Sequence, residues 1–399
     1  MRILAIGSMY PPHHHGGYEL IWESAMELLR DAGHEVAVLA TDFTVPDPEP
    51  RLDPGFPVWR ELRWYLRGNR FPRLSARERL AVESHNARVL GRVLGEVRPD
   101  AVAWWSMGGM SLSLIEHVRA AGIPSVAAMC DDWFAYAPEV DAWTRAFGRR
   151  PRLARAVGAV TRLPTRPDPA AAIGSWVFLS HELEARAERV GLERRRSRVA
   201  HRGPDRIFAE AAAVREHPPW RWQLLYLGRI DRRKGVDLAI EAVAELPEGA
   251  MLTVVGGGDP EELARLQALA APERVAFDDV PREELAATVA NCDALLFPVR
   301  WHEPWGLVPL EAMAAETPVV ASARGGPAEY LRHEENCLVI DPDDGPAALA
   351  AAVRRLADDE PLRLRLVEGG RATAAGIDPK GFEKAVAEEL ELAAANTGA

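Results

Sequence analysis

The alternation of apolar and polar residues predicts repeated strand–helix units in the first half of the chain. Residues 2–6 form a short apolar run, residues 18–31 carry apolar side chains at helical spacing, and residues 34–40 form a second apolar run. Further apolar runs at 101–105, 124–129 and 172–179 predict strands, which accompany helical patterns in the same way. Such units build parallel sheets, and their ligands bind at the carboxyl ends of the strands.

The pattern starts again in the second half of the chain. A linker at 209–219 precedes the apolar run 223–227, and more strand–helix units follow it. A chain of 399 residues also exceeds the usual size of one domain. We therefore predict an α/β fold with two Rossmann-like domains, residues 1–204 and residues 205–378. A C-terminal helix of about residues 379–399 is expected to pack back on the first domain.

Composition and charge limit the class of protein. With 48% hydrophobic and 27% charged residues, the chain is typical of a folded globular protein, and no apolar run reaches the roughly 18 residues that cross a membrane. Residues 1–7 lack the long apolar core of a signal peptide, so a cytoplasmic location is expected. The net charge of -11 argues against nucleic-acid binding. Three scattered cysteines argue against a disulfide framework and a zinc site.

Nearly all positive charge comes from arginine. The chain has only three lysines, Lys234, Lys380 and Lys384, so a lysine is an unusual choice in this sequence. Arginines cluster at 51–79, with interleaved aromatic residues, and at 145–166 among small apolar residues. Solvated surface is one interpretation, and an anionic acceptor or membrane surface is the other. An amphipathic element in the second cluster would hold the protein peripherally at the inner face of the membrane.

Glycines and histidines follow the first strand. Gly16 and Gly17 precede the helical pattern of residues 18–31, and their backbone N–H groups can approach a phosphate closely. The turn lacks the G-x-G-x-x-G dinucleotide fingerprint, and a simple turn is the alternative interpretation. The three histidines at 13–15 would point in different directions, which disfavours a metal site. If the neighbouring loop faces the active cleft, at least one of them is expected to face it too.

Residues 301–314 contain two carboxylates, Glu303 and Glu311, with a glycine between them. Pro309 suits the first turn of a helix, so we expect a helix to begin there, with Glu311 in its first turn. The Glu311 carboxylate and the free N–H groups of residues 306–308 would then face one space, which favours anionic and hydroxyl-rich ligands. The alternative is an acidic loop that leads into an ordinary core helix.

Seven short motifs occur in a characteristic order, at loops that the predicted strands direct toward one cleft. They are Gly16-Gly17-x-Glu19, Gly33-His34-Glu35-Val36, Gly228-Arg229-x5-Gly235, Val254-Val255-Gly256-x-Gly258, Glu303-Pro304-x-Gly306-x4-Glu311, Thr317-Pro318-Val319-Val320-Ala321 and Gly325-Gly326-x2-Glu329. Together they resemble the retaining nucleotide-sugar glycosyltransferases of family 4. The resemblance covers most of the chain and implies the GT-B fold, in which two Rossmann-like domains face each other across a cleft.

The resemblance also implies roles for individual residues. Arg229 and Lys234 would hold the donor's diphosphate, with the backbone of Gly16 and Gly17 opposite. Glu303 would bind the sugar hydroxyls and help to place the anomeric carbon.

Further implied contacts complete the donor site. Glu311 would accept hydrogen bonds from the ribose hydroxyls, and the backbone amides of Gly306, Leu307 and Val308 would cover the phosphates and the sugar. Asp131 stands after a strand where the family often has a histidine that contacts the sugar, so either Asp131 takes that place or the donor contacts differ.

The implied chemistry is transfer of a sugar to an acceptor hydroxyl, with neither a metal ion nor another cofactor. Negative charge grows on the leaving diphosphate, and fixed cations and amides stabilise it. The D-x-D sequence at residues 341–343 is interpreted as a turn rather than as a metal site. No carboxylate is confidently placed as a nucleophile, so we favour attack on the leaving-group face. The acceptor, a glycan, lipid or small molecule, stays open.

Three alternatives share this architecture. A nucleotide-sugar epimerase would act with the donor alone. A phosphorylase-like enzyme would need a lysine for pyridoxal phosphate, which the scarcity of lysine disfavours. A catalytically silent nucleotide-binding protein is disfavoured because residues for the diphosphate, ribose and sugar contacts are all present.

Overall fold

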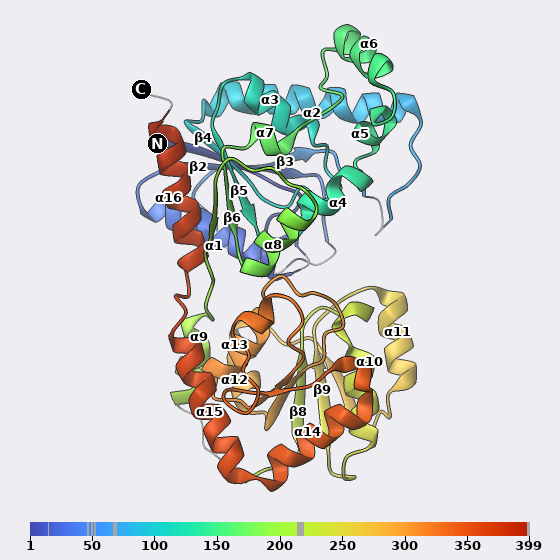
Figure 1. Ribbon diagram of the computed structural model, residues 1–399, viewed down its shortest axis with the longest axis vertical. Coiled ribbons are helices and arrows are strands. Elements are labelled where there is room, and N and C mark those ends of the chain that lie inside the picture. The colour runs from blue at the N-terminus through green and yellow to red at the C-terminus, as the bar shows by residue number, and fades with distance from the viewer. Residues whose placement is uncertain are drawn as a thin grey trace. The chain divides into compact units, whose positions relative to one another are not determined.

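The computed structural model describes residues 1–14, 16–45, 48, 51, 53–66, 70–213 and 219–396 of the chain. The chain forms two compact units, one of Met1–Ala200 with Phe382–Ala399 and the other of His201–Gly381 (Figure 1). Each unit contains one parallel sheet with helices packed against it, so the predicted α/β fold is confirmed.

The first unit is built on a parallel sheet of seven strands in the order β3-β2-β1-β4-β5-β6-β7. Its inner strands are almost completely buried because helices cover both faces, which accounts for their continuous apolar runs (Figure 1). The strands are β1 (Arg2–Ile6), β2 (Glu35–Thr41), β3 (Val58–Leu62), β4 (Ala101–Trp104), β5 (Ser125–Met129), β6 (Ser175–Phe178) and β7 (Ser197–Val199). The helices are α1 (Gly17–Asp31), α2 (Ala76–Val97), α3 (Ser113–Ala120), α4 (Trp133–Val140), α5 (Ala142–Phe147), α6 (Pro151–Thr161), α7 (Pro169–Ala172), α8 (His181–Arg189) and the C-terminal α16 (Gly381–Ala395).

Helix α16 completes the first unit, although more than half of the chain separates it from β1. Phe382 is fully buried with its ring centroid 6.4 Å from that of Trp105. The buried Glu389 carboxylate accepts hydrogen bonds from the Ser175 hydroxyl at 2.7 Å and from the Arg196 guanidinium at 2.8 Å. The prediction that the C-terminal helix packs back on the first domain is therefore confirmed.

The second unit contains a parallel sheet of six strands in the order β10-β9-β8-β11-β12-β13. The strands are β8 (Gln223–Leu227), β9 (Met251–Val255), β10 (Val275–Asp278), β11 (Ala294–Phe297), β12 (Val319–Ala321) and β13 (Leu338–Val339). The helices are α9 (Arg206–Ala213), α10 (Val236–Ala244), α11 (Pro260–Leu269), α12 (Arg282–Ala290), α13 (Leu307–Ala314), α14 (Pro346–Asp358) and α15 (Glu360–Ala375), with short 3₁₀ turns η1 (Arg232–Lys234), η2 (Gly326–Glu329) and η3 (Pro342–Asp344).

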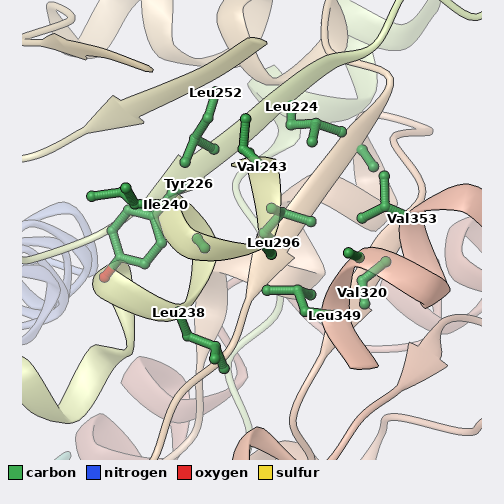
Figure 2. Packing of buried hydrophobic residues seen from close by; sticks show 14 of the residues in the cluster. Leu224, Tyr226, Leu238, Ile240, Val243, Leu252, Leu296, Val320, Leu349 and Val353 are labelled. Atoms are coloured by element: carbon green, nitrogen blue, oxygen red, sulfur yellow. The ribbon is translucent and has the colours of Figure 1, made fainter. Parts of the chain in front are cut away.

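Strands and helices of the second unit share one apolar core. Side chains from the inner strands meet those of α10 and α14 in it (Figure 2). Burial of such side chains stabilises a fold by roughly 1.5–3 kcal/mol each, so this core fixes where the strand ends lie. The labelled residues are Leu224, Tyr226, Leu238, Ile240, Val243, Leu252, Leu296, Val320, Leu349 and Val353.

Three local predictions need correction. Helix α13 begins at Leu307 rather than at Pro309, because Gly306 in a left-handed conformation (φ 77°) ends the preceding loop, and Glu311 therefore lies in the second turn. The strand predicted at 172–179 begins only at Ser175, after the short helix α7. The predicted linker at 209–219 overlaps helix α9, and residues 214–218 lie outside the described residues.

The turn predicted at residues 341–343 is confirmed, since Asp341 caps the 3₁₀ turn η3 and Arg324 binds the carboxylates of Asp341 and Asp343 at 2.6 Å each. Among the residues that the structure describes, no helix is both long and apolar enough to cross a membrane.

Candidate active site

The loop after β8 carries both cations that the sequence assigned to the diphosphate. Gly228 is the first residue after β8, Arg229 follows it, and Lys234 lies in the 3₁₀ turn η1 just before α10. A Cβ atom at Gly235 would lie 2.1 Å from the carbonyl oxygen of Pro298, and its φ is 71°. Only glycine fits this contact, which holds the end of η1 against the loop that follows β11.

Lys234 and Glu303 form an ion pair that is largely buried. The Lys234 Nζ lies 2.5 Å from the Glu303 Oε2, and the two side chains are only 16% and 12% exposed. The Trp301 Nε1–H donates to the same carboxylate oxygen at 2.6 Å, and the Lys234 Nζ lies 5.4 Å from the centroid of the indole ring. The sequence assigned Lys234 to the diphosphate and Glu303 to the sugar, and the structure places the two groups in direct contact.

A second glycine holds the Glu303 loop from the other side. Gly325 has φ 82°, and a Cβ atom there would lie 2.5 Å from the backbone oxygen of Glu303. The Glu303 N–H donates to the Arg324 oxygen at 3.0 Å, and the Gly326 N–H donates to the Glu303 oxygen at 2.7 Å. The Gly325-Gly326 motif therefore fixes the backbone from which Glu303 reaches Lys234.

Arg229 is held less tightly than Lys234. Its guanidinium lies 3.8 Å from the Asp231 carboxylate, and its side chain is 43% exposed. Arg233 binds Asp231 more closely, at 2.7 Å. Burial favours the neutral form of Asp231, but hydrogen bonds from Arg233 and its charge outweigh burial and lower the pKa of Asp231 to about 2. Asp231 is thus a permanent anion, and Arg229 keeps most of its hydrogen-bonding capacity.

The start of α13 supplies backbone donors near Glu303. Leu307 and Val308 are the first two residues of the helix, and their N–H groups precede its first internal hydrogen bonds. The Tyr330 hydroxyl donates to the Gly306 carbonyl. Trp305 packs on Tyr330 with ring centroids 5.1 Å apart. This helix start is therefore fixed in place by buried rings, as an anion-binding position requires.

Glu311 lies one turn further along α13. Burial raises the pKa of the Glu311 carboxyl to about 7, and the charge of Asp205 acts in the same direction against Arg282 and Arg202. Arg202 and Arg282 both bind Asp205, at 2.9 and 3.1 Å. Within the described part of the second unit, no group donates a hydrogen bond to the Glu311 carboxylate, which leaves its oxygens available to a ligand.

In the first unit, Gly16, Gly17 and Asp131 lie at the carboxyl ends of β1 and β5. A Cβ atom at either glycine would meet no atom within 4 Å, so the backbone there is open to approach. The Tyr18 hydroxyl donates to the Ala128 oxygen of β5 at 2.7 Å, which ties the glycine turn to that strand. The Tyr136 hydroxyl donates to the Asp131 Oδ2 at 2.9 Å. Asp131 is therefore positioned by a residue of α4, the helix that follows it.

His13 and Asp132 each have a polar partner within the first unit. His13 accepts a hydrogen bond from the Val45 N–H at 3.3 Å, and burial lowers its pKa. His15 lies outside the described residues. The acid next to Asp131, Asp132, pairs with Arg186 at 2.5 Å.

Sequence reasoning missed several side chains of the second unit. Trp301 and Trp305 flank Glu303, and only their proximity to that carboxylate in the sequence could have indicated a role. Glu329 belongs to a quoted motif but received no role, and it pairs with His201 at 3.0 Å. The His201 ring stacks on Trp305 with centroids 4.4 Å apart. These contacts connect parts of the second unit that are more than 100 residues apart in the chain, and no local pattern predicts them.

Most of the second unit is similar to known proteins in sequence. Residues 208–373 match the family model described as glycosyl transferases group 1. A D-inositol 3-phosphate glycosyltransferase of Xylanimonas cellulosilytica is 35% identical over 181 residues, which are 44% of this chain and 42% of that protein. A glycogen synthase of Mycobacterium tuberculosis is 38% identical over 157 residues, 37% of each chain. The chain thus matches less than half the length of these relatives.

Solved structures resemble the whole chain. An Anabaena protein, Alr3699/HepE, solved in complex with UDP and glucose, has a TM-score of 0.70 at 18% identity over 98% of this chain and 99% of that one. Sucrose-phosphate synthase from Thermosynechococcus elongatus has a TM-score of 0.68 at 20% identity over 98% and 97% of the two chains.

The fold is therefore that of the two-domain GT-B class, as the motifs predicted. Within this fold, residues 208–373 match the family model of the glycosyl transferases group 1. The finer assignment to family 4 stays a prediction.

Proposed function

We propose that the protein is a retaining glycosyltransferase, which moves a sugar from a nucleotide-diphosphate donor to an acceptor hydroxyl without a metal ion. The observation that carries the proposal is the Lys234–Glu303 pair with Trp301, next to the first N–H groups of α13. A cation in contact with a carboxylate, four residues before the free amides of a helix start, matches the charges of a nucleotide sugar, because its diphosphate is anionic and its sugar offers hydroxyl donors.

Lys234 is suited to act on the leaving group. Its ammonium has three N–H donors, and one of them is directed to Glu303. The remaining donors and the guanidinium of Arg229 would bind the diphosphate, whose negative charge grows as the glycosidic bond breaks. Each such charge-assisted hydrogen bond contributes about 1.5–3 kcal/mol when it forms on a charged group. Two cations and the helix amides would together replace the charge that a metal ion supplies elsewhere.

Glu303 is suited to bind the sugar rather than to attack it. Its Oε2 already accepts hydrogen bonds from Lys234 and Trp301, which lowers its nucleophilicity, while its other oxygen can accept from a sugar hydroxyl. Retention would then follow from attack on the leaving-group face, with a diphosphate oxygen taking the proton of the acceptor hydroxyl. Glu311 would accept hydrogen bonds from the ribose.

The similar structures add a donor class to this proposal. The Anabaena protein was solved with UDP and, separately, with UDP-glucose. We infer that the donor is a nucleoside diphosphate sugar, which binds to Arg229, Lys234 and Glu303 of the second unit. UDP-glucose is the first compound to test.

We place the acceptor on the first unit. A cavity of about 390 Å³ lies where β2 and β3 end, between Asp42, Arg63, Trp64 and the start of α2. The buried Asn86 binds both the N–H and the carbonyl of Arg63, at 2.8 and 3.0 Å, which fixes the backbone that carries the Arg63 side chain. An indole ring, a guanidinium and carboxylates suit a hydroxyl-rich acceptor. Arg63→Ala is expected to raise the acceptor KM while donor hydrolysis stays unchanged.

The decisive experiment compares two lysine variants. Thermal shift with UDP-, GDP- and ADP-sugars identifies the donor, and transfer or hydrolysis is then measured. Lys234→Ala is expected to reduce turnover by orders of magnitude, whereas Lys380→Ala, at an exposed lysine of the same unit, should leave it unchanged. Near-normal turnover of Lys234→Ala would refute the diphosphate role.

Other outcomes separate the alternative functions. Isomerisation of the donor with no acceptor present would indicate an epimerase. Donor binding without any turnover over a broad acceptor panel would indicate a silent nucleotide-binding protein. A glycosyl-enzyme adduct in mass spectra would replace the proposed front-face attack with a covalent mechanism.

A further inference from the structure

Helix α6 carries a surface that the proposed transfer reaction does not use. Residues 142–167 contain seven arginines and no Asp or Glu, in a chain whose net charge is -11. All seven side chains are exposed, and in the part of the chain that the structure describes none of them has a carboxylate within ion-pair distance. Elsewhere in the first unit arginines commonly pair with acids, as Arg194 does with Glu184 and Glu188. This concentration of unpaired cations therefore sets apart the segment 142–167, which contains α6.

The outer face of α6 is also apolar on one side. Val160 is 85% exposed and Leu153 is 44% exposed, and the two stand seven residues apart on the same side of the helix. Arg152 and Arg155 lie beside them on the outward face. A purely solvated surface gains nothing from an almost fully exposed valine, whereas a lipid interface accommodates both the cations and the apolar pair.

The packing of α6 keeps this face outward. Ala154 is its only buried residue, and it joins a small apolar cluster with Trp143, Phe147 and Leu163. The Thr165 hydroxyl donates to the Ala154 carbonyl at 3.0 Å, which closes the segment after the helix back onto it. Figure 1 shows α6 projecting at the periphery of the first unit, beyond α2, α3 and α5. The helix is anchored on its inner side and has no neighbour on its outer side among the described residues.

We propose that α6 docks the protein on an anionic lipid surface, with Leu153 and Val160 entering the interface and the surrounding arginines binding lipid phosphates. The partner is a membrane and not a nucleic acid, because a polyanion in water offers no place for the two apolar side chains. The start of α2 extends the surface, since Arg70, Arg73 and Arg77 are exposed there and Leu74 packs on the same apolar cluster as α6.

Vesicle co-sedimentation of the full chain tests the proposal. The protein is expected to bind vesicles of phosphatidylcholine with phosphatidylglycerol, not vesicles of phosphatidylcholine alone, and to dissociate as salt rises. The double variant Arg152→Glu/Arg155→Glu should reduce partitioning at least about tenfold, since each arginine near an anionic surface contributes several-fold in affinity. The control double variant Arg88→Glu/Arg195→Glu makes the same change of charge at exposed arginines elsewhere in the first unit and should reduce it far less.

Replacing an exposed apolar residue distinguishes binding to a lipid surface from binding to a polyanion in water. Val160→Ser should weaken vesicle binding several-fold and leave binding to heparin unchanged, while Val190→Ser, at another exposed valine, changes neither. Equal partitioning of both arginine double variants, or no effect of Val160→Ser on vesicle binding, would overturn the proposal. Circular dichroism and thermal unfolding establish that each variant is folded. Donor binding by the same variants is measured separately, so the failure of either proposal is distinguishable.

Discussion

At the residue scale, the most informative contact is the one between Lys234 and Glu303. A pair that is this little exposed costs desolvation energy, and removing one partner leaves the other charge uncompensated. Such a pair is therefore weak evidence for a contribution to stability and better evidence for a site that binds a charged ligand. The pair also explains why a chain with three lysines retains one here, since a compact ammonium can bind Glu303 and a phosphate oxygen at once.

Trp301 orients Glu303 and gives the first prediction. Trp301→Phe keeps an aromatic ring beside Lys234 but removes the 2.6 Å hydrogen bond to the carboxylate. We expect kcat/KM for transfer to fall about 10- to 100-fold, because a hydrogen bond to a charged group contributes about 1.5–3 kcal/mol. Trp220→Phe is the matched control, since the indole N–H of Trp220 has no partner among the described residues. Equal kcat/KM values for the two variants would show that Trp301 only fills space.

Glu311 gives a prediction about pH. Its pKa in the folded protein is about 7, raised above the ordinary value of 4.5 mainly by burial. The folded state therefore holds a proton that the unfolded chain releases. The contribution of Glu311 to the unfolding free energy is full below about pH 4.5 and is lost as pH rises through about 7. Glu311→Gln should flatten this part of the stability profile, whereas Glu283→Gln on the exposed surface of α12 should not.

Donor binding should respond to the same titration in the opposite sense. Only the ionised Glu311 accepts hydrogen bonds from both ribose hydroxyls, so the donor Kd is expected to fall as pH rises through about 7. Isothermal titration with wild type and Glu311→Gln at several pH values measures this. A wild-type Kd that does not change over that pH range would remove Glu311 from the ribose contact.

At the element scale, the site depends on loops that are held by close backbone contacts. Gly325 supports the Glu303 loop, and Gly235 fixes the end of η1 beside Pro298. Because β8 and β11 are neighbours in the sheet, the loops that follow them carry Lys234 and Glu303 to the same edge. The topology of the sheet thus brings together two residues that are 69 positions apart in the sequence.

Replacing Gly325 tests this dependence. Gly325→Ala puts a Cβ atom 2.5 Å from the Glu303 oxygen and forces alanine into a left-handed conformation. We expect a loss of about 1–3 kcal/mol of unfolding free energy and a loss of turnover of at least about 100-fold, because the Glu303 backbone must move. Gly257→Ala, with no atom within 4 Å of the added Cβ and no positive φ, should change neither quantity much. Full activity of Gly325→Ala would show that the loop tolerates movement.

Element prediction succeeded where one pattern dominated and failed where patterns were mixed. The inner strands β1, β2 and β5 are continuous apolar runs because both of their faces are covered, so the sequence identifies them. The edge strand β3 contains Arg60 and Glu61 and shows no such run. Helices α4 to α7 are short, and prolines interrupt or open three of them, which obscures the helical period.

The site was predictable only as far as its motifs reach. Short motifs singled out Gly17, Lys234 and Glu303 as candidates, and Pro309 placed the start of α13 two residues too late. The Lys234–Glu303 pair, the Trp301 hydrogen bond and the raised pKa of Glu311 depend on three-dimensional packing, and no spacing along the chain encodes them. Charge and burial therefore had to come from the structure.

At the scale of the whole molecule, the chain consists of two units with separate cores, and its last helix returns to the first. The first unit takes its sheet from the beginning of the chain and α16 from the end. The whole second unit therefore lies between these two segments in the sequence. Each unit should consequently respond to mutations in its own core. Phe382, at the start of α16, is fully buried in the first unit. Its replacement tests whether the two cores unfold separately.

Phe382→Ala should destabilise the first unit selectively. The substitution removes a ring packed against Trp105, and such changes cost about 3–5 kcal/mol. Hydrogen exchange with mass spectrometry should then show faster exchange in β1, β4 and α16 and unchanged exchange in β8, β9 and β11, because the apolar core of the second unit contains no residue from α16. Leu392→Ala, at a leucine of α16 that is 45% exposed, is the control and should have little effect. Equally faster exchange in both sheets of Phe382→Ala would mean that the two units unfold as one cooperative body.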